Sequence, residues 1–445
     1  MPKAARRSRA KPAKRNRETL DRLKPSVLAA LPDKELLEAV QRRTFRYFWE
    51  GAHPASGLAR DRLKTTGTPS DDLVAIGGSG FGVMALLVAV ERGWVARDAA
   101  AECLERMLQV LSRATCYHGA FPHFMHGGSG ATIPFTRKDD GGDLVETSML
   151  IMGLLCARQY FRRRTPQDAK LRNLINGLWH DVEWDWYTRD GRNALHWHWS
   201  PNNGWALDLE IRGWNECLVT YLLAVSAPRY AIPPLAYHQG FAAGRDYANG
   251  RLYYGIPLPL GPPYGGPLYF AHYSFSGIDP RGLKDRYADY WIQNLHHVRI
   301  NRAHCAINPR RHKGYSASCW GLTSSDDMNG YAEHSPVNDN GTISPTAAVS
   351  SVPYAPPDSI QAIRHLLGVH GEKVWGRYGF VDAFCEAKNW YADAFLAVDQ
   401  GPMVVMIENY RSGLLWKLFM GAPEVQAGLR ALAFESPHLG GGTAG

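Results

Sequence analysis

The sequence alternates between two kinds of helical segment, and this alternation limits the folds open to the chain. One kind is amphipathic, with apolar residues at helical spacing on one side only. The other kind is apolar on nearly every side, which requires burial all round. Helix pairs that recur at intervals of a few tens of residues are typical of a helical solenoid or toroid. The amphipathic segments cover residues 33–50, 98–113, 167–184, 283–304 and 356–368, and the apolar segments cover residues 76–93, 143–161, 211–224, 341–348 and 401–410.

We therefore predict an all-α protein with about six helical hairpins around one axis and with more than half of residues 33–435 in helices. The inner helices should include residues 143–160, 213–225 and 403–419. The glycines that open the segment at 76–93 favour close helix packing. Their spacing does not match a phosphate-binding loop, and no strand leads into them.

The chain shows no domain boundary within residues 33–435, which we predict to form a single domain. Residues 227–281 interrupt the helical rhythm; they are rich in Pro, Gly and Tyr and should form a long functional loop with short strands. We expect residues 1–32 to be a disordered basic tail and residues 436–445 to be a flexible C-terminal tail.

The positive charge of the chain is concentrated at its N-terminus. The formal net charge is +8, but without residues 1–24 the chain is close to neutral, which argues against a body that binds nucleic acid. No apolar run follows the basic residues, so they do not match a signal peptide, and no stretch is apolar enough to span a membrane. We expect a cytoplasmic protein, with a periplasmic or secreted location as the alternative. Attachment of the tail to an anionic surface is a weaker hypothesis.

The seven cysteines are scattered and include no CxxC pair, so the sequence suggests neither a zinc site nor a disulfide framework. Cys156 and Cys217 lie within apolar helical patterns, where a free thiol packs as a small hydrophobic group. We expect these two cysteines and Leu418 to be inaccessible. A reducing compartment fits this pattern best.

Carboxylates gather where the apolar segments begin. Asp143 suits the N-cap position of one such helix, and Glu146 lies three residues later, as in a capping box. Capping accounts for these two acids and leaves Asp139 and Asp140 unexplained. If the inner helices share one direction, their N-termini open on one face and bring distant acids, including Glu216, into a single pocket.

Two carboxyl groups, one neutral and one ionised, are the minimal apparatus for glycoside hydrolysis. Glu216 lies among Trp214, Cys217 and Leu218, so burial should raise its pKa and suit it to act as an acid. The alternative is a buried acid paired with Arg212. The chain also has 14 Trp and 21 Tyr residues, and large aromatic rings can stack on the apolar faces of sugars.

The run His196-Trp197-His198-Trp199 invites a metal hypothesis, because alternate histidines on a strand point the same way. No third ligand stands out, and an aromatic wall with two hydrogen-bonding histidines is the favoured interpretation. No GxSxG motif supports Ser-His-Asp catalysis.

Several motifs resemble, in the same order, the glucoamylase-like proteins of glycoside hydrolase family 144, from about residue 35 to about residue 435. The resemblance implies an (α/α)6 toroid that hydrolyses β-1,2-glucan to sophoro-oligosaccharides with inversion. It also implies that Asp139, Asp143, Glu146 and Glu216 match acids that are essential in the family. The motifs are Gly141–Thr147, Gly213–Glu216, Trp320–Asp326, Asp339–Ala347, Tyr378–Phe384, Asp399–Pro402 and Met406–Gly413.

Two motifs depart from the family pattern. The family's usual His-Gln-Tyr-Ser-His run is replaced here by Ala271–Phe275, and its usual Ser-Asp-Gly by Ser325–Asp327. Both motifs are expected to touch sugar subsites. The departures therefore bear on substrate length and linkage preference more than on reaction type.

These considerations assign roles to individual residues. Glu216 should protonate the leaving glycosidic oxygen, and Asp139 or Asp143 should activate the water. The two working carboxyl groups should stand roughly 6.5–9.5 Å apart, which leaves room for that water. The substrate should be a β-glucan polysaccharide or oligosaccharide; this chemistry requires no metal or organic cofactor. We expect a monomer.

The alternatives are a transglycosylase acting on β-1,2-glucan and a non-catalytic glycan-binding protein. The predicted substrate-binding residues are Trp197, Trp199, Trp214, His272, Tyr273, Trp320, Asp326, Glu408, Tyr410 and Arg411.

Overall fold

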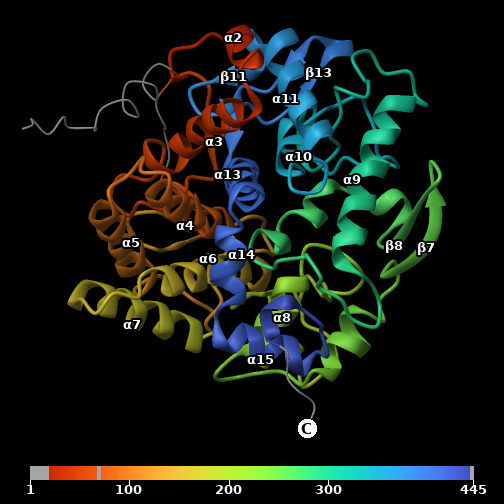
Figure 1. The fold of residues 1–445 in the computed structure, drawn as a ribbon. Coiled ribbons are helices and arrows are strands. Elements are labelled where there is room, and N and C mark those ends of the chain that lie inside the picture. Colours follow the sequence, from red (N-terminus) through yellow and green to blue (C-terminus); the bar gives the residue numbers. More distant parts are fainter. Residues whose placement is uncertain (1–19, 68–71, 441–445) are drawn as a thin grey trace, which may run out of the picture.

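Apolar helices form the inside of the molecule and amphipathic helices cover them (Figure 1). The computed structural model describes residues 20–67 and 72–440. Nearly every residue of the inner helices is buried, whereas the outer helices bury one side. The inner helices are α4 (Ile76–Glu91), α6 (Leu144–Tyr160), α8 (Leu218–Ser226), α10 (Pro345–Ser350) and α13 (Ala397–Arg411), and the outer helices are α3 (Asp33–Trp49), α5 (Arg97–Leu111), α7 (Pro166–His180), α9 (Tyr290–Ile307) and α11 (Pro356–Val369).

A sixth pair closes the ring with much shorter helices. Its outer member is the single-turn helix η2 (Tyr237–Phe241), and its inner members are η4 (Leu268–Ala271) and η5 (Ser274–Ser276). Helix η5 contacts α13 on the inside of the ring. The fold is therefore an (α/α)6 toroid, as the sequence predicted. Within residues 33–435, helices cover 183 of 403 residues, about 45%, so the expectation of more than half is wrong; the short sixth pair and the long connections account for the difference.

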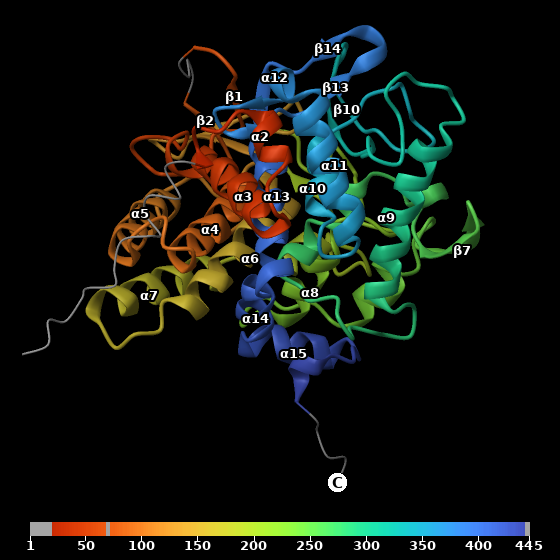
Figure 2. The same cartoon turned by 45° about the horizontal axis from the view of Figure 1, so that its top comes forward.

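The remaining elements are short and lie in the connections, as Figure 2 shows from a second side. The loop predicted at 227–281 contains the hairpin β7–β8 as well as its short helices, and this confirms the prediction of short strands. The paired strands are β1 (Arg62–Lys64) with β15 (Ala394–Leu396), β2 (Leu73–Ala75) with β3 (Phe124–His126) and β4 (Thr132–Ile133), β5 (Gly142–Asp143) with β6 (His198–Trp199), β7 (Ala248–Tyr253) with β8 (Ile256–Leu260), β9 (Ser325–Asp327) with β10 (Gly330–Ala332), β11 (Trp375–Gly376) with β12 (Gly379–Phe380), and β13 (Phe384–Cys385) with β14 (Trp390–Tyr391). The further helices are α2 (Pro25–Ala29), η1 (Trp186–Thr188), η3 (Pro263–Gly265), α12 (Gly371–Val374), η6 (Glu386–Lys388), α14 (Leu414–Met420), α15 (Pro423–Ala431) and η7 (Pro437–Leu439).

Some predicted boundaries differ from the structure. The inner helix expected at 403–419 is two helices, α13 and α14, because the chain turns at Gly413 with a φ of 68°. The predicted tails are also shorter: within residues 1–32, helix α2 buries Leu28 and packs on α11, while residues 1–19 and 441–445 lie outside the described part. The main hydrophobic core includes residues from Leu28 to Phe434, and a second, small cluster consists of Tyr253, Leu258 and Ile300.

The predicted burial of inner-helix residues is largely confirmed. Cys156 and Cys217 are fully buried, and all seven cysteines are free. Leu418 is only partly buried, because it belongs to α14 rather than to a continuous inner helix, so that prediction is wrong. Among the described residues, no helix combines the length and apolar character that a membrane crossing needs.

Two glycines let α4 and α6 touch through their backbones. A β-carbon at Gly153 would lie 2.2 Å from the carbonyl oxygen of Gly80, and one at Gly80 would lie 2.3 Å from that of Met149. Both distances are far below van der Waals contact. The sequence interpretation of these glycines as residues for close packing is correct for this pair.

The inner helices α4, α6 and α13 run in the same direction. The backbone N–H of Gly77, at the start of α4, donates to the side chain of Glu146, at the start of α6. Likewise Gly78 lies beside Ala397 at the start of α13, and Arg92 just after α4 pairs with Glu408 near the end of α13. Their N-termini therefore meet at one end of the toroid, which is the arrangement that brings distant acids together.

The close contact of α4 and α6 predicts a large stability difference between two glycine substitutions. Gly153→Ala forces the two helices apart and should lower the free energy of unfolding by about 1–3 kcal/mol. Gly177→Ala, on the outer helix α7, places its β-carbon in open space. This substitution should raise the free energy of unfolding by about 0.4–1 kcal/mol. Denaturant unfolding of both variants measures the difference. Equal effects of the two substitutions would contradict the packing described here.

Candidate active site

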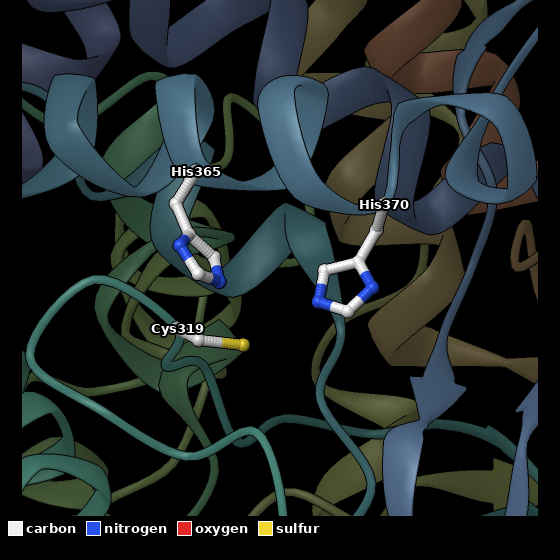
Figure 3. Close-up of side chains that lie close together, drawn as sticks. All are labelled: Cys319, His365 and His370. Carbon is white, nitrogen blue, oxygen red and sulfur yellow. The ribbon is translucent and has the colours of Figure 1, made fainter.

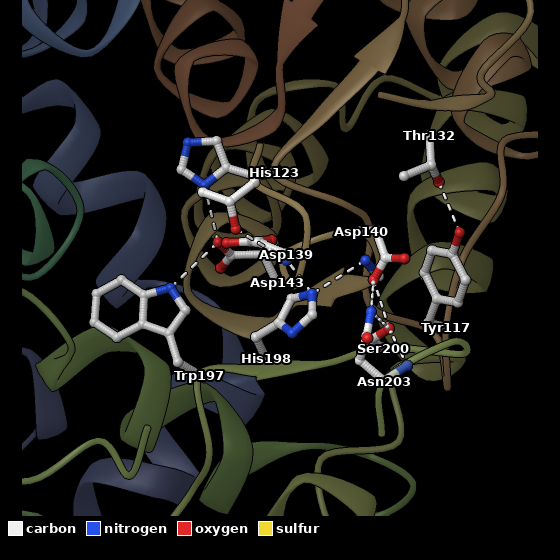
Figure 4. Close-up of polar contacts among 12 residues, drawn as sticks. Tyr117, His123, Thr132, Asp139, Asp140, Asp143, Trp197, His198, Ser200 and Asn203 are labelled. Atoms are coloured by element: carbon white, nitrogen blue, oxygen red, sulfur yellow. Dashed lines mark hydrogen bonds and ion pairs between the residues drawn. The ribbon is translucent and has the colours of Figure 1, made fainter. Parts of the chain in front are cut away.

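Helix α6 begins at a network of polar side chains drawn from three segments of the chain (Figure 4). Oδ1 of Asp143 accepts the backbone N–H groups of Val145 and Glu146, each at 2.9 Å, which confirms Asp143 as the N-cap. Its Oδ2 lies 3.0 Å from Nδ1 of His123 and accepts the indole N–H of Trp197 at 3.2 Å. Both oxygens of this buried carboxylate are therefore held in place by hydrogen bonds.

Glu146 connects two inner helices instead of completing a capping box. Its carboxylate accepts the N–H of Gly77 at 2.6 Å, while the N–H of Asp143 is bonded to the carbonyl of Phe121. Burial raises the pKa of Glu146 to about 7; the charge of His123 opposes this rise and that of Asp143 adds to it. Glu146 thus titrates near neutral pH at the junction of α4 and α6.

His123 completes the charge balance of this network. Burial lowers the pKa of His123, but the charges of Glu146 and Asp143 and the hydrogen bond to Asp143 outweigh burial and raise the pKa to about 10. The imidazole is therefore a cation at neutral pH. Phe135 stacks on it with ring centroids 4.5 Å apart and remains 53% exposed, so an aromatic face points outward beside the carboxylates.

Asp139 is the unengaged carboxylate of the network. Its Oδ1 lies 3.3 Å from Nε2 of His198, but that nitrogen already accepts the N–H of Gly141 at 3.0 Å. Oδ1 is consequently buried without a hydrogen-bond donor in the described part of the chain. Burial raises the pKa of Asp139 to about 6, with a further contribution from the charge of Asp143.

Asp140, which does not cap a helix, forms hydrogen bonds that hold a neighbouring turn. Its carboxylate accepts the hydroxyl of Ser200 at 2.5 Å and the amide of Asn202 at 2.8 Å. These bonds brace the turn that follows β6. Asp140 is therefore held away from the other acids of its run.

Glu216 is 7% exposed and lies immediately before α8. The hydroxyl of Ser274 accepts the N–H of Val219 at 2.9 Å and donates to the carbonyl oxygen of Glu216, which positions this turn. Burial, with smaller contributions from the charges of Glu333, Asp143 and Glu146, raises the pKa of Glu216 to about 8. Arg212, the basic partner considered from the sequence, bonds Glu210 instead.

The charges of Asp143 and Glu146 contribute to the raised pKa of Glu216, so these acids are near enough to interact electrostatically. Its side chain is protonated at neutral pH, while Asp139 is mostly ionised there. The site therefore offers one neutral and one charged carboxyl group. The spacing of Glu216 from Asp139 stays a prediction.

A second group of acids lies at the start of α13, and the sequence analysis missed most of it. Asp382 accepts the backbone N–H of Asp326 at 2.6 Å, and Asp326 is in turn paired with Arg62 at 3.0 Å. Burial raises the pKa of Asp382 to about 7; burial together with Asp382 raises the pKa of Asp399 well above its usual range. The rule that singled out Asp143, an acid in the entrance of an inner helix, also applies to Asp399.

The two groups of acids share neighbours. The charge of Asp61 contributes to the raised pKa of Asp399 in the second group and also to that of Glu146 in the first. Tyr273 packs against Phe81 with tilted rings whose centroids are 5.3 Å apart, and the charges of both Asp399 and Glu216 act on its phenol. The predicted site residue Tyr273 thus lies among the acids of both groups.

Another aromatic side chain, which the sequence analysis did not select, flanks this second group. Tyr331 on β10 pairs with Asp326 on β9 and is 52% exposed. Its exposure next to buried acids distinguishes it from the core aromatics. No sequence signal marks this, because exposure depends on how the connection folds over the ring.

Several predicted substrate-binding residues lie in the core. Trp320 is fully buried, and Trp214 is buried among Phe241, Tyr247, Phe275 and Tyr290. His272 is also buried; its Nε2 lies 3.0 Å from the hydroxyl of Ser351. Burial and His297 lower the pKa of His272 to about 3, which keeps the imidazole neutral. These three side chains are part of the packing around the site.

Three other predicted residues lie at the opposite end of α13. The helix begins at Ala397, not at Gly401, so Glu408 falls in its last turn, roughly 14 Å along the axis from Asp399. Glu408 is paired with Arg92 at 2.6 Å, and Arg411 is bonded to Gln41 and Glu38. The structure does not bring Glu408, Tyr410 and Arg411 to the acids, because they sit at the C-terminal end of the helix.

The two histidines of the His196-Trp197-His198-Trp199 run do not converge. His198 lies beside Asp139, whereas His196 packs against Trp205, and its Nε2 is 4.0 Å from both Asp208 and Glu210. Trp199 makes an edge contact with His118 and a tilted contact with Tyr117, consistent with an aromatic wall.

One set of atoms in the site could hold a cation. His123, Asp139 and Asp143 each offer a ligand atom, and these atoms lie within 4.8 Å of one another. Because Nδ1 of His123 and both oxygens of Asp143 already bond to one another or to neighbours, a cation here would have to displace those bonds.

Known proteins resemble the chain over most of its length. A family model described as "Putative glucoamylase" matches residues 208–423. An exo β-1,2-glucooligosaccharide sophorohydrolase (non-reducing end) of Parabacteroides distasonis is 42% identical over 423 residues. That match covers 90% of this chain but 58% of the relative, so the chain spans little more than half of the curated relative's length.

Two solved structures share the whole fold. An endo-β-1,2-glucanase from Chitinophaga pinensis, in complex with sophorotriose and glucose, is 50% identical with a TM-score of 0.89. The match covers 92% of this chain and 100% of that one. A protein from Bacteroides uniformis ATCC 8492, described as a glucoamylase like the family model, is 52% identical with a TM-score of 0.89 and covers 92% of this chain and 99% of its own.

The hydrogen bonds around His123 predict its titration. In the wild type, the imidazole should show no loss of its proton between about pH 6 and pH 8 in an NMR titration of the ring nitrogens. Asp143→Asn removes one negative charge, so the pKa of His123 should fall toward the ordinary value of about 6.5. Asp140→Asn is the matched control and should leave it unchanged, because Asp140 faces Ser200 and Asn202. A wild-type His123 that titrates near pH 6.5 would contradict this electrostatic description.

Proposed function

We propose that this chain, which belongs to the glucoamylase-like family, glycoside hydrolase family 144, hydrolyses β-1,2-linked glucan to sophoro-oligosaccharides. Two relatives that act on β-1,2-glucans, one named as an exo-acting and one as an endo-acting enzyme, support the substrate class. The observation that carries the proposal is the buried Glu216, whose pKa of about 8 keeps it protonated beside ionisable acids.

Glu216 is the general acid in this proposal. A carboxyl group must be neutral to donate a proton, and burial provides that at neutral pH. The proton passes to the glycosidic oxygen as the bond to the anomeric carbon breaks. The carboxylate left behind is then reprotonated from solvent for the next cycle.

Asp139 is the general base. The sequence left Asp139 and Asp143 as alternatives, and the hydrogen bonds favour Asp139. Both oxygens of Asp143 accept hydrogen bonds, whereas Oδ1 of Asp139 has no donor in the described residues and the Asp139 side chain is 12% exposed, so this carboxylate is free to take a proton from water. The water attacks the anomeric carbon from the face opposite the leaving group, so the product has inverted configuration.

Asp143 and Glu146 act as positioning residues. Asp143 orients Trp197 and keeps His123 charged, and Glu146 ties α4 to α6. Phe135 and Tyr331 are the proposed stacking surfaces for sugar rings, because they are exposed aromatic residues beside the two groups of acids.

Product analysis tests the reaction and the role of Glu216 together. Wild-type protein should generate new reducing ends and sophoro-oligosaccharides from β-1,2-glucan, and none from β-1,3-glucan or starch. Glu216→Gln should lower the rate by about 10²–10⁴-fold, the usual contribution of a general acid. A substrate with a good leaving group should recover much of this loss, since its departure needs little protonation.

Asp139→Asn provides the contrast. It should lose a similar factor without rescue by the activated substrate, because the attacking water still needs a base. Rings or elongated chains without new reducing ends would indicate transfer instead of hydrolysis. Full activity of Glu216→Gln would exclude Glu216 as the acid.

The two pKa values predict a bell-shaped pH profile. Below about pH 6 Asp139 takes up a proton and the base is lost; above about pH 8 Glu216 loses its proton and the acid is lost. The ratio kcat/KM should therefore fall on both sides of this range. Residual activity of Glu216→Gln should lack the alkaline decline. Wild-type kcat/KM that still rises above pH 9 would argue against these assignments.

A further inference from the structure

A second cluster of ligand-type side chains lies outside the candidate active site (Figure 3). Cys319 comes from the connection between α9 and α10, His365 from α11, and His370 caps the end of α11. Each offers one ligand atom, and these atoms lie within 4.8 Å of one another. In Figure 3 the Cys319 sulfur and the two imidazoles point toward a common space.

The imidazole of His370 has an unsatisfied buried nitrogen in this space. The residue is 6% exposed, and its Nε2 has no hydrogen-bond partner among residues 20–67 and 72–440. The other nitrogen, Nδ1, lies 3.4 Å from the hydroxyl of Tyr391, and the ring packs against Phe384 with centroids 4.9 Å apart. Buried nitrogens are usually hydrogen-bonded in proteins, so this nitrogen of His370 is available to bind a ligand.

The carboxylate of Glu386 lies close enough to His370 to serve as a fourth ligand. Oε2 of Glu386 lies 3.7 Å from Nε2 of His370, and Oε1 lies 3.3 Å from Nζ of Lys313. A bound dication would compensate the thiolate and the carboxylate at once.

We propose that Cys319, His365 and His370, with Glu386 as the fourth ligand, bind one Zn²⁺ ion. Thiolate and imidazole donors suit zinc, whereas magnesium and calcium prefer oxygen. Zinc bond lengths of roughly 2.0–2.3 Å place tetrahedral ligand atoms about 3.3–3.8 Å apart. The three ligand atoms already lie within 4.8 Å of one another, so small side-chain rotations would bring them to this spacing. The histidines are separated by four residues, a spacing found in zinc-binding pairs.

The ion would connect elements that are far apart in the sequence. It would link the end of α11 to the connection 308–344 and to helix η6, where Glu386 lies. That connection also carries β9 and β10 with Asp326 and Tyr331, and it places Glu333 near Glu216. The site is therefore structural, and it does not depend on the proposed function.

Metal analysis of the full chain tests the proposal. After removal of metals with a chelator and addition of Zn²⁺, the dialysed wild-type protein should retain one ion per chain. Co²⁺ in its place should give a thiolate-to-cobalt charge-transfer band. Cys319→Ser and His370→Gln should each weaken Zn²⁺ binding by at least about 100-fold, since changes outside the direct ligands already cost roughly 10–100-fold.

Two matched variants identify the site. Cys116→Ser changes an exposed cysteine, and Asp139→Asn changes the other possible cation cluster; both should retain the ion. Failure of the wild type to retain Zn²⁺ would overturn the proposal. So would a Co²⁺ spectrum without the thiolate band, retention by Cys319→Ser, or loss in Asp139→Asn. None of these outcomes depends on glucan hydrolysis.

Discussion

The backbone contact between α4 and α6 is the constraint on which the site depends. Gly80 and Gly153 allow the two helices to approach without side chains between them, and this brings the N–H of Gly77 within 2.6 Å of Glu146. Helix α13 runs parallel to α4, so its first turn meets the same end of the ring. The positive ends of helices with unpaired N–H groups favour carboxylates. Parallel packing thus concentrates acids at one end of the toroid.

Among the acids gathered at this end of the toroid, hydrogen bonds decide which carboxylates are fixed in the structure and which can exchange protons. Asp143 accepts four hydrogen bonds and Asp140 is held by Ser200 and Asn202, so both are committed to structure. Asp139 and Glu216 lack such engagement, and burial raises the pKa of each. The same helix ends therefore supply a scaffold of fixed carboxylates around two that can exchange protons.

The sequence predicted part of this site and missed another part for identifiable reasons. Asp143 and Glu216 stood out because each precedes a long apolar segment. Asp382 and Asp399 did not, although Asp399 obeys the same rule, because Gly401-Pro402 was taken as the start of α13. Because of that shift of a few residues, the predicted site residue was Glu408, which lies in the last turn of α13. An error of a few residues in the start of α13 therefore placed the predicted acid at the wrong end of the helix.

The sequence by itself determined the inner and outer helices, the N-cap at Asp143 and the burial of Cys156 and Cys217. These features follow from local propensity and from apolar patterns, which act over one or two helical turns. Tertiary structure alone decided which carboxylates are free, that Trp214 and Trp320 serve the core, and that Cys319 meets His365 and His370. The reason is physical: whether a polar atom is satisfied depends on partners that are distant in sequence, such as Gly77 for Glu146 and Gly141 for His198.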